Sequence, residues 1–226
     1  SDFEFLRKEK QLTVEAEAMG FDFAAAVEHH FTDYAACPDP VQALNWVAAK
    51  TSKIKLMPAA VILPWNDPLR VVEKVSMLDS LSEGRVILGM GRGAARREFK
   101  GFRKDIADSR ELFDEAALII MDGLETGTVK ADTKHFQQPE VEIRPRPQGW
   151  TRDRFAMVSM SPSSAEVAAD YGLKAIRFSQ GDWSYSMVEI NAYRGTYEAK
   201  HKKKVPPFII SEFVVCVETE AEVAEY

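Results

Sequence analysis

The sequence predicts an α/β fold built from repeated βα units, and three observations lead to this prediction. Helical patterns that end near Gly or Pro alternate with short apolar strands. The strands lack polar alternation, as expected of parallel strands that are covered on both faces. Charged, hydroxyl-bearing and glycine residues follow several strands, where an α/β barrel carries its chemistry. A closed barrel and an open, doubly wound sheet both fit this alternation.

The first part of the chain supplies two helix and strand pairs. A helix over Phe5–Met19 is expected to end at Gly20, which can adopt the left-handed conformation that follows many helices. A strand over Phe23–Val27 follows at once. A second helix over Pro40–Lys50 then leads into a strand over Lys55–Ala60.

The next part continues the pattern. The Asp67-Pro68 pair provides an N-cap and a first-turn proline for a helix that runs to Leu81. A strand over Arg85–Met90 follows, and the glycine-rich and charged stretch Gly91–Asp108 is predicted to be a long functional loop. An amphipathic helix over Ser109–Leu124 completes this unit.

Lys134–Gly149 contains three prolines, which interrupt the hydrogen bonds of a central strand, so we expect an extended insertion at about residues 130–150. Residues 219–226 are predicted to begin one more helix. The remaining elements are strands at Phe155–Val158, Ala175–Phe178 and Phe208–Val217, and helices at Ser163–Tyr171 and Tyr185–His201.

We expect residues 1–226 to form a single, incomplete barrel domain. The pattern contains about six strands, whereas a (β/α)8 barrel has about eight strands in roughly 250 residues. The chain also begins in a helix with no strand before it. We therefore expect one strand to be missing before Ser1 and at least one after Tyr226.

Composition excludes several classes of function. The formal net charge is -6, and the one dense basic run, Lys200–Lys204, has no aromatic residues between its charges, which disfavours a nucleic-acid partner. No apolar stretch approaches the roughly 18 residues of a membrane span, and the N-terminus lacks a signal-peptide pattern. We therefore expect a cytoplasmic protein that does not associate with a membrane. Cys37 and Cys216 are expected to be free thiols.

Glu28, His29 and His30 directly follow the first predicted strand. If they continue that strand, the two imidazoles point to opposite sides, so only one can enter a site and the other packs. A metal site is disfavoured, because no Asp or Cys lies at ligand spacing. A hydrogen-bonded structural pair at the strand end is the other interpretation that the residues allow.

Two segments that follow strands are candidate anion sites. Gly89-Met90-Gly91-Arg92-Gly93 combines glycines, which permit close backbone approach, with an Arg that can bind a phosphate. The run from Ser159 to Ser164 opens a helix whose free amides attract anions. A tight loop would explain the glycines equally well, and helix capping would explain the serines.

Several of these motifs in order resemble the bacterial luciferase-like monooxygenase family. The resemblance covers most of the chain up to Gly172 and implies a luciferase-like (β/α)8 TIM barrel. It also implies a reduced flavin mononucleotide (FMN) cofactor, which a separate NAD(P)H:flavin reductase supplies, and dioxygen chemistry through a flavin C4a-hydroperoxide. The matching motifs are EHHFTDY at 28–34, PAAVILP at 58–64, DPLR at 67–70, MLDSLSEGR at 77–85, GRG at 91–93 and SRELFDEA at 109–116.

The resemblance also assigns roles to residues. His29 corresponds to the catalytic histidine, and Glu28, which lies beside it in the flavin pocket, is the second candidate catalytic residue. Arg92 corresponds to the arginine that binds the flavin phosphate. A non-prolyl cis peptide bond is implied between Ala59 and Ala60. The other implied flavin contacts are Val158, Ser161 and Ser164.

The sequence also departs from bacterial luciferase itself. Gly91 stands in place of a reactive cysteine and Met160 in place of a glutamate, which favours a non-luminous oxygenase acting on a small apolar aldehyde, ketone or terpenoid, as a homodimer or heterodimer. A deazaflavin-dependent hydride-transfer enzyme and a non-catalytic flavin-binding partner subunit are the alternatives. Possible substrate-pocket walls are Phe31, Trp65, Phe99, Phe102 and Trp183.

Overall fold

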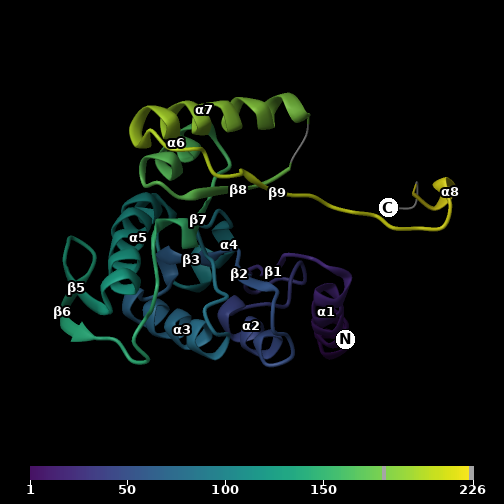
Figure 1. Ribbon diagram of the computed structural model, residues 1–226, viewed down its shortest axis with the longest axis horizontal. Helices are drawn as coiled ribbons and strands as arrows, with labels where there is room; N and C mark the ends of the chain where they lie inside the picture. The colour runs from purple at the N-terminus through teal and green to yellow at the C-terminus, as the bar shows by residue number, and fades with distance from the viewer. Residues whose placement is uncertain (180–181, 224–226) are drawn as a thin grey trace.

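The computed structural model describes residues 1–179 and 182–223, and its centre is a curved parallel sheet (Figure 1). Two backbone hydrogen bonds join its two parts: the N–H of Leu56 donates to the carbonyl of Arg85, and the carbonyl of Leu56 accepts the N–H of Ile87. One part pairs β1 (Phe23–Ala26) with β2 (Lys55–Pro58). The other part contains, in spatial order, β3 (Val61–Ile62), β4 (Leu88–Gly91), β7 (Phe155–Val158), β8 (Lys174–Phe178) and β9 (Ile209–Ser211).

The strand order confirms the predicted barrel architecture over the doubly wound alternative. Apart from the short β3, each parallel strand lies next to the parallel strand that precedes it in the chain. A doubly wound sheet instead reverses its order at a switch point. The chain therefore has the winding of a (β/α)8 barrel. Among the described residues the barrel is open, because no strand pairs β9 with β1.

Helices cover the outside of this sheet (Figure 1). Their apolar sides and the outward side chains of the strands form the main core, which includes Leu56, Leu88 and Phe155. A smaller cluster around Met57, Ala156 and Ile176 fills the inside of the curve. No helix among the described residues is long and apolar enough to cross a membrane. The covering helices are α2 (Pro40–Ala48), α3 (Pro68–Leu81), α5 (Ser109–Thr126), α6 (Pro162–Asp170) and α7 (Trp183–His201).

The first helix and strand differ from the prediction. Helix α1 (Asp2–Met19) begins three residues earlier than expected, and none of its residues is buried. Strand β1 ends at Ala26, and only Ala24 in it is buried, so this strand is not covered on both faces. Its position at the edge of the sheet explains the difference, because no strand lies on its other side among the described residues.

The predicted long loop Gly91–Asp108 is partly helical. It contains α4 (Arg96–Gly101) and the short 3-10 helix η2 (Ile106–Asp108), both too short to show a periodic pattern. The expected insertion is an antiparallel hairpin of β5 (Thr128–Asp132) and β6 (Gln137–Glu142), and it begins before the predicted segment. Two further 3-10 helices are η1 (Leu63–Trp65) and η3 (Arg152–Arg154).

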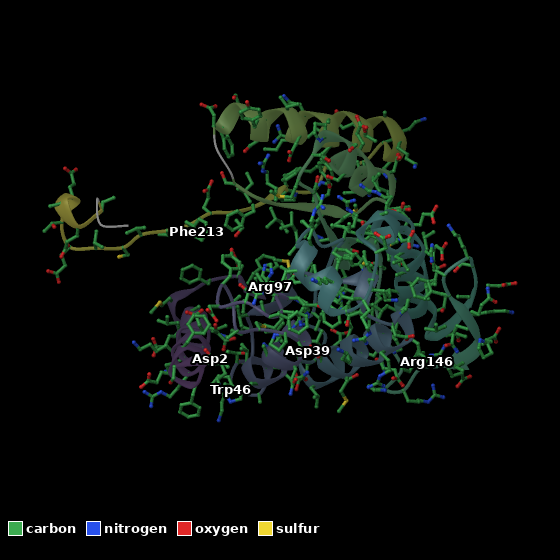
Figure 2. All side chains as sticks on the ribbon, turned by 180° about the vertical axis from the view of Figure 1, so that it is seen from behind. Asp2, Asp39, Trp46, Arg97, Arg146 and Phe213 are labelled. Carbon is green, nitrogen blue, oxygen red and sulfur yellow. The ribbon has the colours of Figure 1, made fainter. Side chains whose placement is uncertain are left out.

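The long strand predicted at Phe208–Val217 is wrong, because β9 contains only Ile209–Ser211. Beyond it the chain leaves the body of the fold, and Figure 2 shows Phe213 on this extension. Phe213 and Val214 are exposed, so the apolar pattern there reflects no buried strand. Helix α8 (Glu220–Val223) agrees with the expected last helix, whose end at 224–226 lies outside the described residues.

The motif MLDSLSEGR at 77–85 has a structural role. The buried Arg85 donates to the backbone carbonyls of Ala48, Thr51, Ile54 and Ser82. Asp79 accepts from the indole of Trp150 at 3.0 Å. These contacts fix α3 to the neighbouring loops, so this part of the family-like pattern supports the fold and lies outside the site described next.

Candidate functional site

The candidate residues gather at the edge of the sheet where its parallel strands end. Strands β4 and β7 are in register with Met90 opposite Met157, so Arg92 and Ser159 both follow directly after paired strand ends. The end of β1 is tied to the same edge, because a carboxylate oxygen of Glu28 accepts the backbone N–H of Ile62 at 2.9 Å. The fold therefore brings three of the predicted segments together.

Glu28 is a buried carboxylate with a full set of hydrogen bonds. Besides Ile62, it accepts from the indole of Trp65 at 2.6 Å and from the side-chain amide of Asn66 at 2.9 Å. Its Oε1 also lies 3.1 Å from Nε2 of His30. These bonds hold the turn at 62–66 against the end of β1, so the geometry assigns Glu28 a structural task at the site.

The two histidines have different surroundings. His30 is enclosed by Glu28 and by edge-on contacts with Trp65 and Phe102, at ring-centroid distances of 6.0 and 4.6 Å. The His29 side chain is 33% exposed and packs edge-on against Tyr34. Only His29 thus has a ring that is accessible at this edge.

Glu98, which sequence reasoning did not identify, is the partner of His29. It comes from α4, its side chain is only 4% exposed, and its Oε1 lies 3.1 Å from Nδ1 of His29. The same oxygen accepts the backbone N–H of His30 at 2.8 Å. Its position in a charged loop was visible in the sequence, but its contact with His29 depends on a fold of the chain across 69 residues.

An aromatic cluster packs beside the histidines. Trp65 stacks on Phe102 at 5.4 Å and meets Phe99 edge-on at 4.9 Å. Phe31 contacts Phe102 at 5.4 Å. Four of the five expected pocket aromatics are therefore close together, although Phe99 is fully buried and belongs to the packing. Trp183 lies on α7 and makes none of the aromatic contacts of this cluster among the described residues.

Small residues form the inner surface of the sheet next to these groups. The peptide bond between Ala59 and Ala60 is cis, as the resemblance implies. A Cβ placed on Gly91 would lie 3.1 Å from Cβ of Ala60 and 3.8 Å from Cγ2 of Val158. Ala59, Ala60 and Val158 are thus on the inner side of adjacent strands, where they present little bulk to a flat ring.

Arg92 is exposed just beyond this small-residue surface. Among the described residues, no carboxylate lies within salt-bridge distance of its guanidinium. Its charge acts on the carboxyl of Asp114 on α5. Burial raises the pKa of that carboxyl, while the guanidinium groups of Arg110 and Arg92 act in the opposite direction. Arg92 is therefore available to an anion.

Ser161 and Ser164 form the N-terminal cap of α6. The Ser161 hydroxyl accepts from the Ser164 N–H at 3.3 Å, and the Ser164 hydroxyl accepts from the N–H groups of Ser161 and Met160 at 3.0 and 3.1 Å. The two hydroxyls thus hold the turn, as the capping interpretation expects. An anion at this turn would meet the positive end of the helix dipole and the exposed Ser163.

The residues present fit a phosphorylated flavin better than a metal. In the described part of the chain, no three His, Cys, Asp or Glu side chains come together as a metal site. The edge instead offers the exposed guanidinium of Arg92, a helix N-terminus, a floor of small side chains and one accessible imidazole. Such an arrangement can bind an anionic, planar molecule and place a hydrogen-bonding group beside it.

Comparison with known proteins agrees with this geometry. The family model for luciferase-like monooxygenases matches residues 4–226. The alkanal monooxygenase alpha chain of the Kryptophanaron alfredi symbiont is 34% identical over 173 residues, which cover 76% of this chain and 48% of that protein. The beta chain from Photorhabdus laumondii is 27% identical over 167 residues, covering 74% and 52%. The chain thus spans about half the length of these curated relatives.

Solved structures share the fold. Monooxygenase RslO1 from Streptomyces bottropensis superimposes with a TM-score of 0.84 at 27% identity, over 94% of this chain and 65% of that one. The oxygenating constituent of 3,6-diketocamphane monooxygenase from Pseudomonas putida, solved in complex with FMN, gives a TM-score of 0.83 at 20% identity, over 98% and 65%.

Proposed function

Because the chain belongs to the luciferase-like monooxygenase family, we propose that it binds reduced FMN at the strand-end edge described above and acts there as a flavin-dependent monooxygenase. The observation that carries the proposal is the exposed guanidinium of Arg92, which pairs with no carboxylate of the described residues, beside the floor of small residues. Bound reduced flavin supplies the electrons that activate dioxygen for transfer of one oxygen atom to an organic substrate.

Each part of the edge has a task in this proposal. Arg92 and the N-terminus of α6 hold the FMN phosphate, because both attract a dianion. Ala59, Ala60 and Val158 allow the flavin ring to lie close to the sheet. Glu28 keeps the turn at 62–66 closed on the site through its hydrogen bonds.

His29 is the proposed catalytic residue. Its imidazole is the accessible one of the adjacent pair, and an imidazole can accept or donate a proton near neutral pH. The aromatic cluster of Trp65, Phe102 and Phe31 packs beside the histidines and gives the neighbouring surface an apolar character. This apolar wall favours a small apolar substrate such as an aldehyde, a ketone or a terpenoid.

The partners follow from the same proposal. Reduced FMN comes from a separate NAD(P)H:flavin reductase, and dioxygen is the second substrate. Relatives described as alpha and beta chains support association with a second subunit, either a copy of this chain or a related one.

The test compares FMN with riboflavin, which lacks the phosphate. Anaerobic titration of the reduced forms should show tighter binding of FMN, and Arg92→Ala should reduce this preference, leaving the part that the N-terminus of α6 supplies. A charge-assisted hydrogen bond contributes about 1.5 to 3 kcal/mol, which corresponds to a roughly 10- to 100-fold loss of FMN affinity. The matched control is Arg194→Ala, which removes the same charge from the exposed side of α7 and should change neither affinity.

Turnover identifies the class of reaction. Incorporation of labelled oxygen from isotopic dioxygen into an aldehyde or ketone panel would support the monooxygenase. Solved F420-dependent enzymes share this fold. One of them, an F420-dependent secondary alcohol dehydrogenase, superimposes on this chain with a TM-score of 0.71. Oxidation of an alcohol with a deazaflavin and without dioxygen would therefore favour the hydride-transfer alternative. Flavin binding with no turnover in any partner complex would favour a supporting subunit, and no flavin binding at all would contradict the proposal.

A further inference from the structure

The contact between Glu98 and His29 carries an inference that rests on the proposed function and deepens it. We infer that Glu98 is a positioning residue, which holds His29 in the tautomer that has its hydrogen on Nδ1 and leaves Nε2 free to accept a hydrogen bond. Glu98 acts through His29 and has no contact of its own with the reacting atoms in this proposal.

The hydrogen-bonding geometry defines the tautomer. Oε1 of Glu98 accepts the backbone N–H of His30 at 2.8 Å, and a backbone N–H can only donate. The same oxygen lies 3.1 Å from Nδ1 of His29. An ionised carboxylate has no hydrogen to give, so Nδ1 must carry one. The other ring nitrogen, Nε2, then bears the lone pair.

The remaining contacts leave Nε2 available. No described side chain or backbone group hydrogen-bonds Nε2 of His29, and the side chain is 33% exposed. His30 shows the contrast, because its Nε2 lies against the buried Glu28 and its ring is enclosed by Trp65 and Phe102. Each of the adjacent histidines thus contacts its own carboxylate. The pair of His30 with Glu28 is enclosed, whereas the pair of His29 with Glu98 leaves the other side of the His29 ring exposed.

The negative charge of Glu98 is explained by its pairing with His29. A buried carboxylate is destabilising unless it is paired, and a neutral Gln would serve the His30 N–H equally well. Among the described residues, His29 is the one basic side chain within salt-bridge distance of Glu98. The arrangement matches the general rule that a carboxylate on one ring nitrogen sets the role of the other.

The position of Glu98 is rigid. The next residue of α4, Phe99, is buried and packs against Trp65. Further on, Phe102 stacks on the same indole, and a Cβ on Gly101 would lie 2.3 Å from Cε2 of Phe31. The helix is therefore packed tightly against the segment that carries the histidines, which keeps Oε1 at hydrogen-bond distance.

Nitrogen NMR of the imidazoles tests this inference without flavin or turnover. The chain has four histidines, and His29→Gln assigns the signal of interest. We expect the parent protein at a pH where the ring is neutral to show hydrogen on Nδ1 of His29. Glu98→Ala should move the hydrogen toward Nε2, Glu98→Asp should restore the original pattern in part, and the exposed Glu9→Ala on α1 should change nothing.

Turnover provides the second readout. Glu98→Ala should lower kcat by about 10- to 100-fold with FMN affinity unchanged, since misplacing a catalytic group by about 1 Å can itself cost about 100-fold. Hydrogen on Nε2 in the parent protein, or an unchanged tautomer in a folded Glu98→Ala, would overturn the inference. If Glu98→Ala fails to fold, the parent spectrum and Glu98→Gln, which keeps an acceptor for His30, still decide it. Failure of oxygenase activity alone would refute the proposed function and leave the NMR result standing.

Discussion

Replacing Gly89 with Ala tests whether close backbone packing supports the candidate flavin floor. A Cβ at this position would lie 2.5 Å from the carbonyl oxygen of Pro58 and 3.2 Å from Cα of Ala59. Both obstacles are backbone atoms of the neighbouring strand end, so no side-chain rotation relieves the clash. Overpacking of this kind costs about 1 to 3 kcal/mol, and we expect the free energy of unfolding to fall by that amount.

The same substitution at Gly195 is the matched control. Gly195 lies exposed within α7, and a Cβ there would meet nothing within 4 Å. Ala is favoured over Gly in a helix by about 1 kcal/mol, so Gly195→Ala should raise the free energy of unfolding.

Urea denaturation of both variants at one pH measures the change in the free energy of unfolding. FMN titration measures whether Gly89→Ala also weakens binding at the candidate flavin floor. A Gly89→Ala variant as stable as the parent, with unchanged FMN affinity, would refute the claim that this contact shapes the site.

Two further predictions concern charged groups outside the site. Backbone N–H groups of Ser52, Lys53 and Ile54 lower the pKa of Glu17 to about 2. Because the folded pKa lies below the unfolded one, the contribution of Glu17 is full above about pH 4.5 and is lost as the pH falls toward 2. Glu17→Gln should therefore flatten the decline in urea midpoint over that range, and an unchanged slope would contradict the assignment. Arg177 and Glu189 form a buried pair at 2.8 Å, so Arg177→Met should destabilise the fold by about 3 to 5 kcal/mol, whereas adding Glu189→Leu should recover most of the loss.

Local sequence signals predicted most of the elements. The strand at Phe155–Val158 has the predicted bounds, and the Asp67-Pro68 start of α3 is also confirmed. These signals work because capping residues, prolines and apolar runs act within a few positions of the chain. The prediction failed where a pattern was short, as in α4, or where an apolar run lies outside the core, as at Phe213 and Val214.

The residues of the candidate site were also only partly predictable from the sequence. Sequence motifs selected Glu28, His29 and Arg92 as candidates, and the structure places them at one edge of the sheet. The family resemblance assigned the catalytic role to His29, but the residues themselves could not distinguish the two histidines, because their difference depends on which carboxylate each one meets. It also did not identify Glu98, whose partner lies 69 positions away.

The sequence by itself determined the α/β class, the order of the elements and the type of residue that follows each strand. These depend on periodicity and on local backbone chemistry. Only the tertiary structure decided that Glu28 supports the turn at 62–66 and that Glu98 faces His29. The physical reason is that such contacts join residues far apart in the chain. Their hydrogen bonds exist only after the strands have paired and the helices have packed against them.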